Sequence, residues 1–116
     1  MDVPVVVDSL ANNIERYMDM LSMRQRVVSS NIANADTPGY KTKDLDFSSV
    51  LQAAESTGQP KQIDVSGLTT KNDGNNVDLD REARLLSENA LRFNIAASLM
   101  KSELTQIRQA IKEGNS

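Results

Sequence analysis

The stretch Asp78–Glu113, DLDREARLLSENALRFNIAASLMKSELTQIRQAIKE, carries the clearest structural pattern in the sequence. Its apolar residues recur at alternating steps of four and three, which is the spacing of one helix face. A repeat of about 3.5 residues sustained over several heptads is typical of a coiled-coil seam. We therefore predict a long helix over residues 78–113. Its seam consists of Leu79, Ala83, Leu86, Ala90, Phe93, Ala97, Met100, Leu104, Ile107 and Ile111.

A second helical pattern near the amino terminus predicts a helix over residues 8–36. Its apolar face consists of Leu10, Ile14, Tyr17, Leu21 and Val28. The helix is expected to end before Pro38, because the proline ring disfavours helical backbone at the preceding residue. Pro38 and Gly39 fit the central positions of a type II turn, where glycine accepts a positive φ.

Residues 37–77 are predicted to form a turn and an irregular connector, because glycine and proline interrupt a polar stretch. Within it, residues 46–55 place apolar side chains on one side of a helical wheel, which is compatible with a short helix. The fold class is therefore all-α, with residues 1–116 as a single unit. Two long terminal helices are expected to form an antiparallel, coiled-coil-like hairpin joined by the loop-rich connector.

Composition excludes several classes of function. The chain has no His and no Cys, which removes the commonest general base and the thiolate metal ligands. A net charge of -3 disfavours binding to nucleic acid. No apolar run approaches the roughly 18 to 20 residues that span a bilayer, and no basic segment marks a cleavable signal peptide. We expect no catalytic, cofactor-binding or metal-binding residues. An enzyme that uses carboxylates for catalysis would need a closed pocket, and a chain with so few aromatic residues is poorly able to build one.

Two weaker candidate sites are set aside. Asp73, Asn75, Asp78 and Asp80 resemble a calcium loop in composition, but Gly74 stands second, where such a loop needs it sixth. The twelfth position is Arg84, where a bidentate Glu is needed, so a turn followed by an acidic helix start is the better interpretation. The cations of the first helix, Arg16, Arg24 and Arg26, are expected to be solvated or paired with another subunit.

Both predicted helices carry apolar residues outside their main face, and a helix apolar on more than one side is usually buried on more than one side. On the first helix these residues are Met18, Met20, Met23 and Val27, and on the second Leu85, Leu91, Ile95 and Leu99. A two-helix hairpin can cover only one face of each helix. We therefore expect neighbouring subunits to cover the second apolar face, with ordering of the chain coupled to assembly. A self-sufficient small bundle is the alternative.

The segment SSNIANADTPGYK at residues 29–41 resembles the signature of flagellar rod, hook and hook-associated proteins. Three further strings strengthen the likeness: DLDF at residues 44–47, DGNNVDLDRE at 73–82 and NALRF at 89–93. The short connector has no room for the β domains of the larger relatives. This favours a proximal rod protein and leaves open which one. The motif residues are Asn31, Ile32, Ala33, Asn34, Thr37, Pro38, Gly39 and Tyr40.

The resemblance implies a structural subunit of the basal-body rod, a helical axial tube that transmits torque and surrounds the export channel. It implies as partners other copies of the chain, other rod or basal-body proteins and the flagellar type III export apparatus. The implied location is the periplasmic rod, reached from the cytoplasm without a cleaved signal peptide. The rival interpretation is a soluble helical-hairpin adaptor or export chaperone that forms a discrete coiled-coil dimer.

Overall fold

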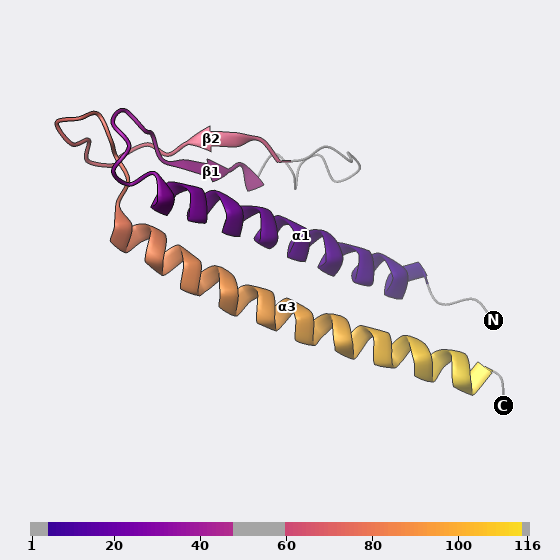
Figure 1. The fold of residues 1–116 in the computed structure, drawn as a ribbon. Coiled ribbons are helices and arrows are strands. Elements are labelled where there is room, and N and C mark those ends of the chain that lie inside the picture. The colour runs from indigo at the N-terminus through magenta and orange to yellow at the C-terminus, as the bar shows by residue number, and fades with distance from the viewer. Residues whose placement is uncertain (1–4, 48–59, 115–116) are drawn as a thin grey trace.

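Two long helices dominate the computed structural model, which describes residues 5–47 and 60–114. Helix α1 spans Val5–Ala33 and helix α3 spans Leu79–Gly114. They run antiparallel along each other and place the start of α1 and the end of α3 at the same end of a molecule of 70 × 26 × 18 Å (Figure 1). The predicted all-α hairpin with a loop-rich connector is confirmed. The short helix predicted over 46–55 lies, beyond Phe47, outside the described residues.

Turn and cap chemistry sets the two helix ends at the closed end of the hairpin. After α1, the Thr37 carbonyl accepts a hydrogen bond of 3.2 Å from the Tyr40 N–H, and Gly39 has φ 77°. These are the features of a type II turn, as predicted. At the start of α3, the Asp78 carboxylate accepts bonds of 3.0 and 3.2 Å from the N–H groups of Asp80 and Arg81. Asp78 is therefore the N-cap residue of α3.

A small antiparallel sheet that the sequence did not predict lies in the connector. Strand β1 spans Lys43–Leu45 and pairs with strand β2, Gln62–Asp64, with Asp44 opposite Ile63. The sheet lies against α1 on the side away from α3 (Figure 1). Lys43 and Asp64, which are cross-strand neighbours, also form an ion pair. The chain thus supplies a third element that covers part of α1.

The face that α3 turns toward α1 differs from the predicted seam. The buried residues of α3 are Glu82, Leu85, Asn89 and Ala96. The predicted seam residues Leu79, Leu104 and Ile111 are instead 54, 44 and 41% exposed. Ala83 and Ala90 are also exposed, whereas Leu86, Phe93, Ala97, Met100 and Ile107 are half-buried. The helix is rotated because Glu82 and Asn89 find hydrogen-bond partners on the α1 side, a preference that an apolar count does not register.

On α1 the predicted face is buried in part: Ile14, Leu21 and Val28 are buried, whereas Leu10 and Tyr17 are 44 and 37% exposed. Its second face, predicted to await a neighbouring subunit, is also partly covered within the chain. Met20 and Val27 are buried and Met18 and Met23 are half-buried, and Val27 lines a hollow with Leu45 of β1. On α3, Leu85 belongs to the core, while Leu91, Ile95 and Leu99 are exposed.

Candidate assembly surface and the polar cluster that supports it

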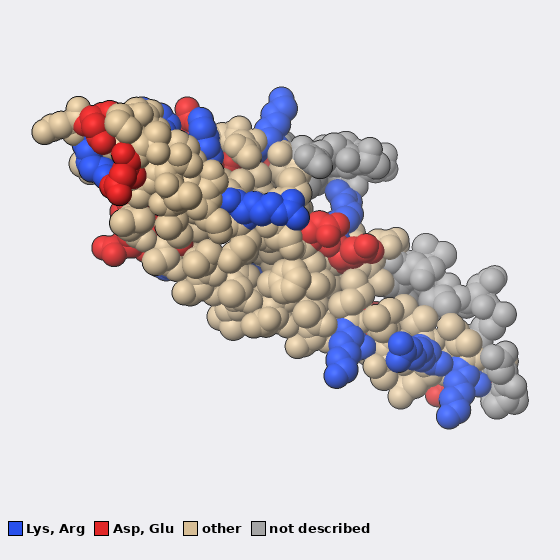
Figure 2. All heavy atoms as spheres, viewed as in Figure 1, with Lys and Arg blue, Asp and Glu red and all other residues tan. Residues whose placement is uncertain are grey.

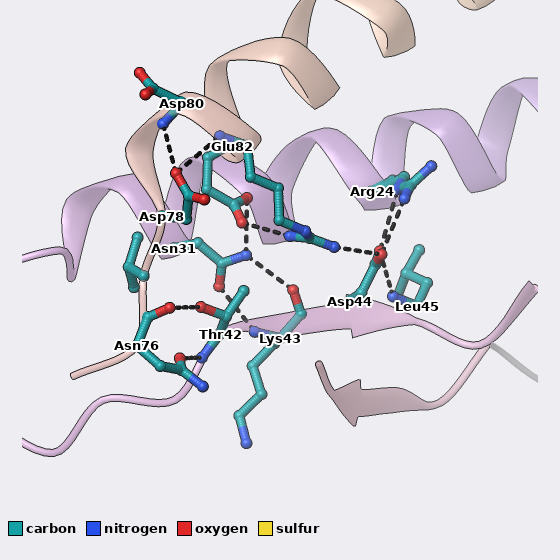
Figure 3. Close-up of polar contacts among 12 residues, drawn as sticks. Arg24, Asn31, Thr42, Lys43, Asp44, Leu45, Asn76, Asp78, Asp80 and Glu82 are labelled. Carbon is teal, nitrogen blue, oxygen red and sulfur yellow. Dashed lines mark hydrogen bonds and ion pairs between the residues drawn. The ribbon is translucent and has the colours of Figure 1, made fainter. Parts of the chain in front are cut away.

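Five polar side chains are buried where α1, β1 and α3 meet, and we call them the closed-end cluster. They are Asn31, Thr42, Asn75, Asn76 and Glu82, each between 0 and 9% exposed. Figure 3 shows Asn31 and Glu82 pointing toward each other, while Thr42 bonds to Asn76. Buried polar groups of this kind are tolerated only when their hydrogen bonds are made. The cluster therefore demands a specific geometry from each segment.

Asn31 stands at the centre of the cluster and makes a hydrogen bond in each direction that its amide allows. Its Oδ1 accepts from the Tyr40 hydroxyl at 2.9 Å and from the Lys43 N–H at 3.1 Å. Its Nδ2 donates to the Lys43 carbonyl at 2.8 Å and to Glu82 Oε2 at 3.1 Å. One side chain of α1 thus fixes the returning chain, the start of β1 and the first turn of α3 (Figure 3).

Side chains of alternating charge form a network of ion pairs that begins at the buried Glu82 carboxylate. Arg81 donates to Glu82 Oε1 at 2.6 Å and reaches Asp44 Oδ2 at 3.5 Å. Arg24 donates from Nε and a terminal nitrogen to the two oxygens of Asp44, at 3.1 and 2.9 Å. Its guanidinium also lies 5.1 Å from the Phe47 ring centroid. The expectation that Arg24 is solvated or paired with another subunit is therefore wrong, because a partly buried carboxylate of β1 binds it in two places.

The two asparagines that precede α3 tie its entry segment to the turn after α1. Asn75 Nδ2 donates to the carbonyls of Asn34 and Thr37, both at 2.9 Å. Asn76 Oδ1 accepts from the Thr42 N–H at 2.6 Å, and the Thr42 hydroxyl donates back to the Asn76 carbonyl at 3.2 Å. Gly74 approaches so closely that a Cβ on it would lie 3.3 Å from the Gly39 Cα. The two motif segments therefore act as one unit.

Most of the predicted motif residues gather at this unit, but not all of them point into it. Asn31 belongs to the closed-end cluster and accepts a hydrogen bond from Tyr40, and Thr37 donates to Asn34 at 3.0 Å. Ile32 is 37% exposed, and Ala33, Pro38 and Gly39 also lie on the surface. The sequence missed the roles of Glu82 and Thr42. The only signal for Glu82 was its place in the first turn after the Asp78 cap, at the end of a motif string.

Beyond the cluster the helices share a shallow apolar groove of about 350 Å³. It is lined by Asn13, Ile14, Tyr17, Arg92, Ile95, Ala96 and Leu99. The exposed Leu91 lies one turn before Ile95 on the same helix and extends the apolar surface. A Tyr17 hydroxyl 3.5 Å from an Arg92 nitrogen raises the pKa of the guanidinium, which is charged at neutral pH in any case. The groove offers contact area rather than reactive groups.

Within residues 5–47 and 60–114, no three His, Cys, Asp or Glu side chains are arranged to hold a metal ion. The carboxylates of the cluster are instead bound by arginine and asparagine. Among the described helices, none combines the length and the apolar content of a membrane span. What the arrangement can do is present two long helices, fixed relative to each other at one end, to other proteins.

A sequence profile of flagella basal body rod proteins matches residues 18–41, which include the turn motif and most of α1 that leads into it. The class is thus a rod protein of the flagellar basal body. A relative named flagellar basal body rod protein FlgB from Aeromonas hydrophila is 34% identical over 88% of this chain and 92% of its own length. Proteins of the same name from Escherichia coli K12 and Bacillus subtilis are each 28% identical, covering 87 and 88% of the chain and 91 and 92% of their own lengths. The chain belongs to the FlgB family of flagellar basal body rod proteins, which are structural proteins and not enzymes.

Proposed function

We propose that the chain is a proximal subunit of the flagellar rod that packs against copies of itself and other rod proteins through the exposed faces of its two helices. The observation that carries the proposal lies on α3, where Leu91, Ile95 and Leu99 are 61, 53 and 53% exposed at successive i, i+4 positions. A contiguous apolar strip of this length on a small protein marks an interaction site. Membership of the FlgB family indicates that the assembly is the flagellar rod.

The predicted seam supports a contact on the other flank of the same helix. Leu79, Leu104 and Ile111 are exposed there, so α3 carries apolar side chains on both sides of its contact with α1. A hairpin with one strip on each flank can contact two neighbours, which is what a helical tube requires of each subunit. In such a tube the helices form the inner layer, surround the export channel and transmit torque along their backbones.

The proposal includes the route to the assembly site. The chain is exported from the cytoplasm to the periplasmic rod by the flagellar type III apparatus, without a cleaved signal peptide. A thin hairpin with few fully buried apolar side chains unfolds at low cost, which suits passage through a narrow channel. Ordering of the helix ends is then completed by the neighbouring subunits, because the last third of α3 has no buried residue of its own.

The test replaces the natural gene with one that encodes Leu91→Glu and Ile95→Glu together. Two carboxylates in the exposed strip should abolish rods in isolated basal bodies and stop swimming, while circular dichroism shows the same helix content as the natural chain. Asn94→Glu, an exposed polar position on the same turn, is the matched control and should swim normally. Normal rods with both substitutions would contradict the proposal. A discrete dimer of the natural chain that ignores other rod proteins would support the adaptor instead.

A further inference from the structure

Two like-charged pairs of opposite sign stand on the two helices. Glu15 and Asp19 lie one turn apart on α1, and Arg108 and Lys112 lie one turn apart on α3. Lys101, seven residues before Arg108, extends the basic pair along the same side of α3. Like charges at positions i and i+4 repel and weaken the helix that carries them. On α1 this repulsion is a local cost that opposite charges from another molecule would offset, whereas the C-terminal end of α3 already stabilises the basic pair in part.

Neither pair forms an ion pair with another described residue, although Arg16 lines the same hollow as Glu15 and Asp19. All of these side chains are exposed, and the ion pairs within residues 5–47 and 60–114 involve other residues. Asn89 of α3 donates to the Leu21 carbonyl of α1, so the contact between the helices lies on another side and far from Arg108 along the axis. Figure 2 shows basic side chains gathered over the final part of α3 and acidic ones over α1.

We propose that α1 of one copy binds α3 of a second copy, with Glu15 and Asp19 facing Lys112 and Arg108. The inference rests on the proposed function, from which it takes self-association, and it names the surfaces that meet. A second copy is the occupant because one chain carries both halves of the complementary surface. The contact is heterologous, since different patches meet, and heterologous contacts that do not close into a ring propagate into open helical assemblies.

Apolar and shape features accompany the charges on both sides. Leu104 and Ile111 are 44 and 41% exposed next to the basic pair on α3. On α1 the acidic pair lines a shallow hollow of about 520 Å³ together with Ser9, Asn12, Asn13 and Arg16, and the half-buried Met18 lies between Glu15 and Asp19 in the sequence. Arg16 has a contact of its own within the chain. The hollow receives side chains from a helix laid along α1.

The direction of the copies fixes the register. Because α1 and α3 are antiparallel within a chain, copies that point the same way in a tube place α1 antiparallel to the neighbouring α3. Glu15 then meets Lys112 while Asp19 meets Arg108, since both pairs have the same four-residue spacing. Within one copy Leu21 lies opposite Asn89. The neighbour is therefore displaced by about 17 residues, or roughly 25 Å along the helix axis.

Charge reversal tests the pairing. The variants Glu15→Lys with Asp19→Lys, and Arg108→Glu with Lys112→Glu, should each lower self-association about tenfold at low salt, measured by sedimentation of the full chain. All four substitutions together should restore it. Reversing the exposed pair Arg84 and Glu88, which already neutralise each other on α3, is the matched control and should leave self-association unchanged.

Engineered cysteines test the register, since the natural chain has no Cys. Ser22→Cys and Thr105→Cys lie opposite each other across the proposed contact. Within one copy they are about 25 Å apart along the axis, too far for an internal disulfide. The double variant should form covalent oligomers on oxidation. Ser22→Cys combined with Gln106→Cys, which is rotated by about 100° on α3, should form few.

The outcomes separate this inference from the proposed function. The pairing is wrong if the charge reversals leave self-association unchanged, or if the variant with all four substitutions folds but does not self-associate. In either case the proposed function stands as long as the natural chain still builds rods. If the reversals release another rod protein and spare self-association, the occupant is not a second copy and the inference also fails. A natural chain that neither self-associates nor enters rods overturns the proposed function itself.

Discussion

Replacement of Asn31 by Ala tests whether the polar cluster holds the closed end of the hairpin together. The side chain is fully buried and bonds to Tyr40, Glu82 and both backbone groups of Lys43. Alanine removes all of these bonds at once. It also leaves the N–H and C=O of Lys43 and an oxygen of Glu82 without a partner in a space too small to hydrate freely.

The magnitude follows from the kinds of bond that are lost. Three of the bonds are neutral, at about 1 kcal/mol each, and one has a charged acceptor, at about 2, so Asn31→Ala should lower the free energy of unfolding by about 5 kcal/mol. Small domains have only about 5 to 15 kcal/mol in total. With a urea dependence of about 2 kcal/mol per M, the midpoint should fall by about 2.5 M.

The assay is urea denaturation of the full chain at a concentration where it is monomeric, followed by circular dichroism. Asn94→Ala is the matched control, because Asn94 is exposed on α3 and its loss should change stability by no more than about 0.5 kcal/mol. A change for Asn31→Ala below about 1 kcal/mol would show that water replaces these bonds without loss. In that case the motif residues do not hold the closed end of the hairpin together.

Three further predictions are tested by denaturation. Gly74→Ala should cost about 2 kcal/mol, more than Gly67→Ala at about 1, because both residues have φ near 80° but only Gly74 faces backbone at 3.3 Å; equal costs would contradict this. Arg24→Gln and Asp44→Asn should show a coupling of about 1 to 3 kcal/mol in a double-mutant cycle that high salt reduces little, and additive effects would contradict it. Asn89→Leu should lower the free energy of unfolding by only about 1 kcal/mol, because it removes two hydrogen bonds to α1 but also a buried Oδ1 that has no donor among the described residues, and a loss above about 3 would be contrary evidence.

Local rules predicted the parts of the fold that local chemistry determines. Periodicity over long segments identified both helices, and the restriction that Pro38 places on its neighbour located the end of α1. The type II turn followed from Pro38-Gly39 because glycine alone adopts φ 77° without strain. These features depend on neighbours within a few residues, which a sequence displays directly.

The rotation of α3 could not be predicted, because it depends on partners far away in the sequence. The apolar repeat favours a seam through Leu79 and Leu104, yet Glu82 is 0% exposed and lies on the side that meets α1. A buried carboxylate is normally excluded from a core unless it is paired. Its partners are Asn31, 51 positions earlier in the chain, and Arg81. Only the folded chain shows that they meet.

The small sheet escaped prediction for a different reason. Its strands have three residues each, which is too short for an alternating pattern to differ from chance. Its pairing also spans the residues between Leu45 and Gln62 rather than a tight turn. The strand β1 is fixed mainly by Asn31, which bonds both backbone groups of Lys43, and by Arg24, which binds Asp44. The sheet is thus a consequence of α1 more than of its own sequence.

Buried polar groups at the closed end and exposed apolar groups on α3 are both expected of a chain that assembles with other proteins. Hydrogen bonds at the closed end depend on geometry, so they specify one alignment of α1 and α3 even where little apolar area is buried. Apolar contact is less directional and grows with the area covered, so Leu91, Ile95 and Leu99 stabilise the chain only when another protein covers them. Exchanging Glu82 for leucine would therefore leave Asn31 and Arg81 without an acceptor and weaken the alignment that places the outer strips. The exposed apolar residues form the surface for assembly, and the motif residues form the contacts that orient this surface.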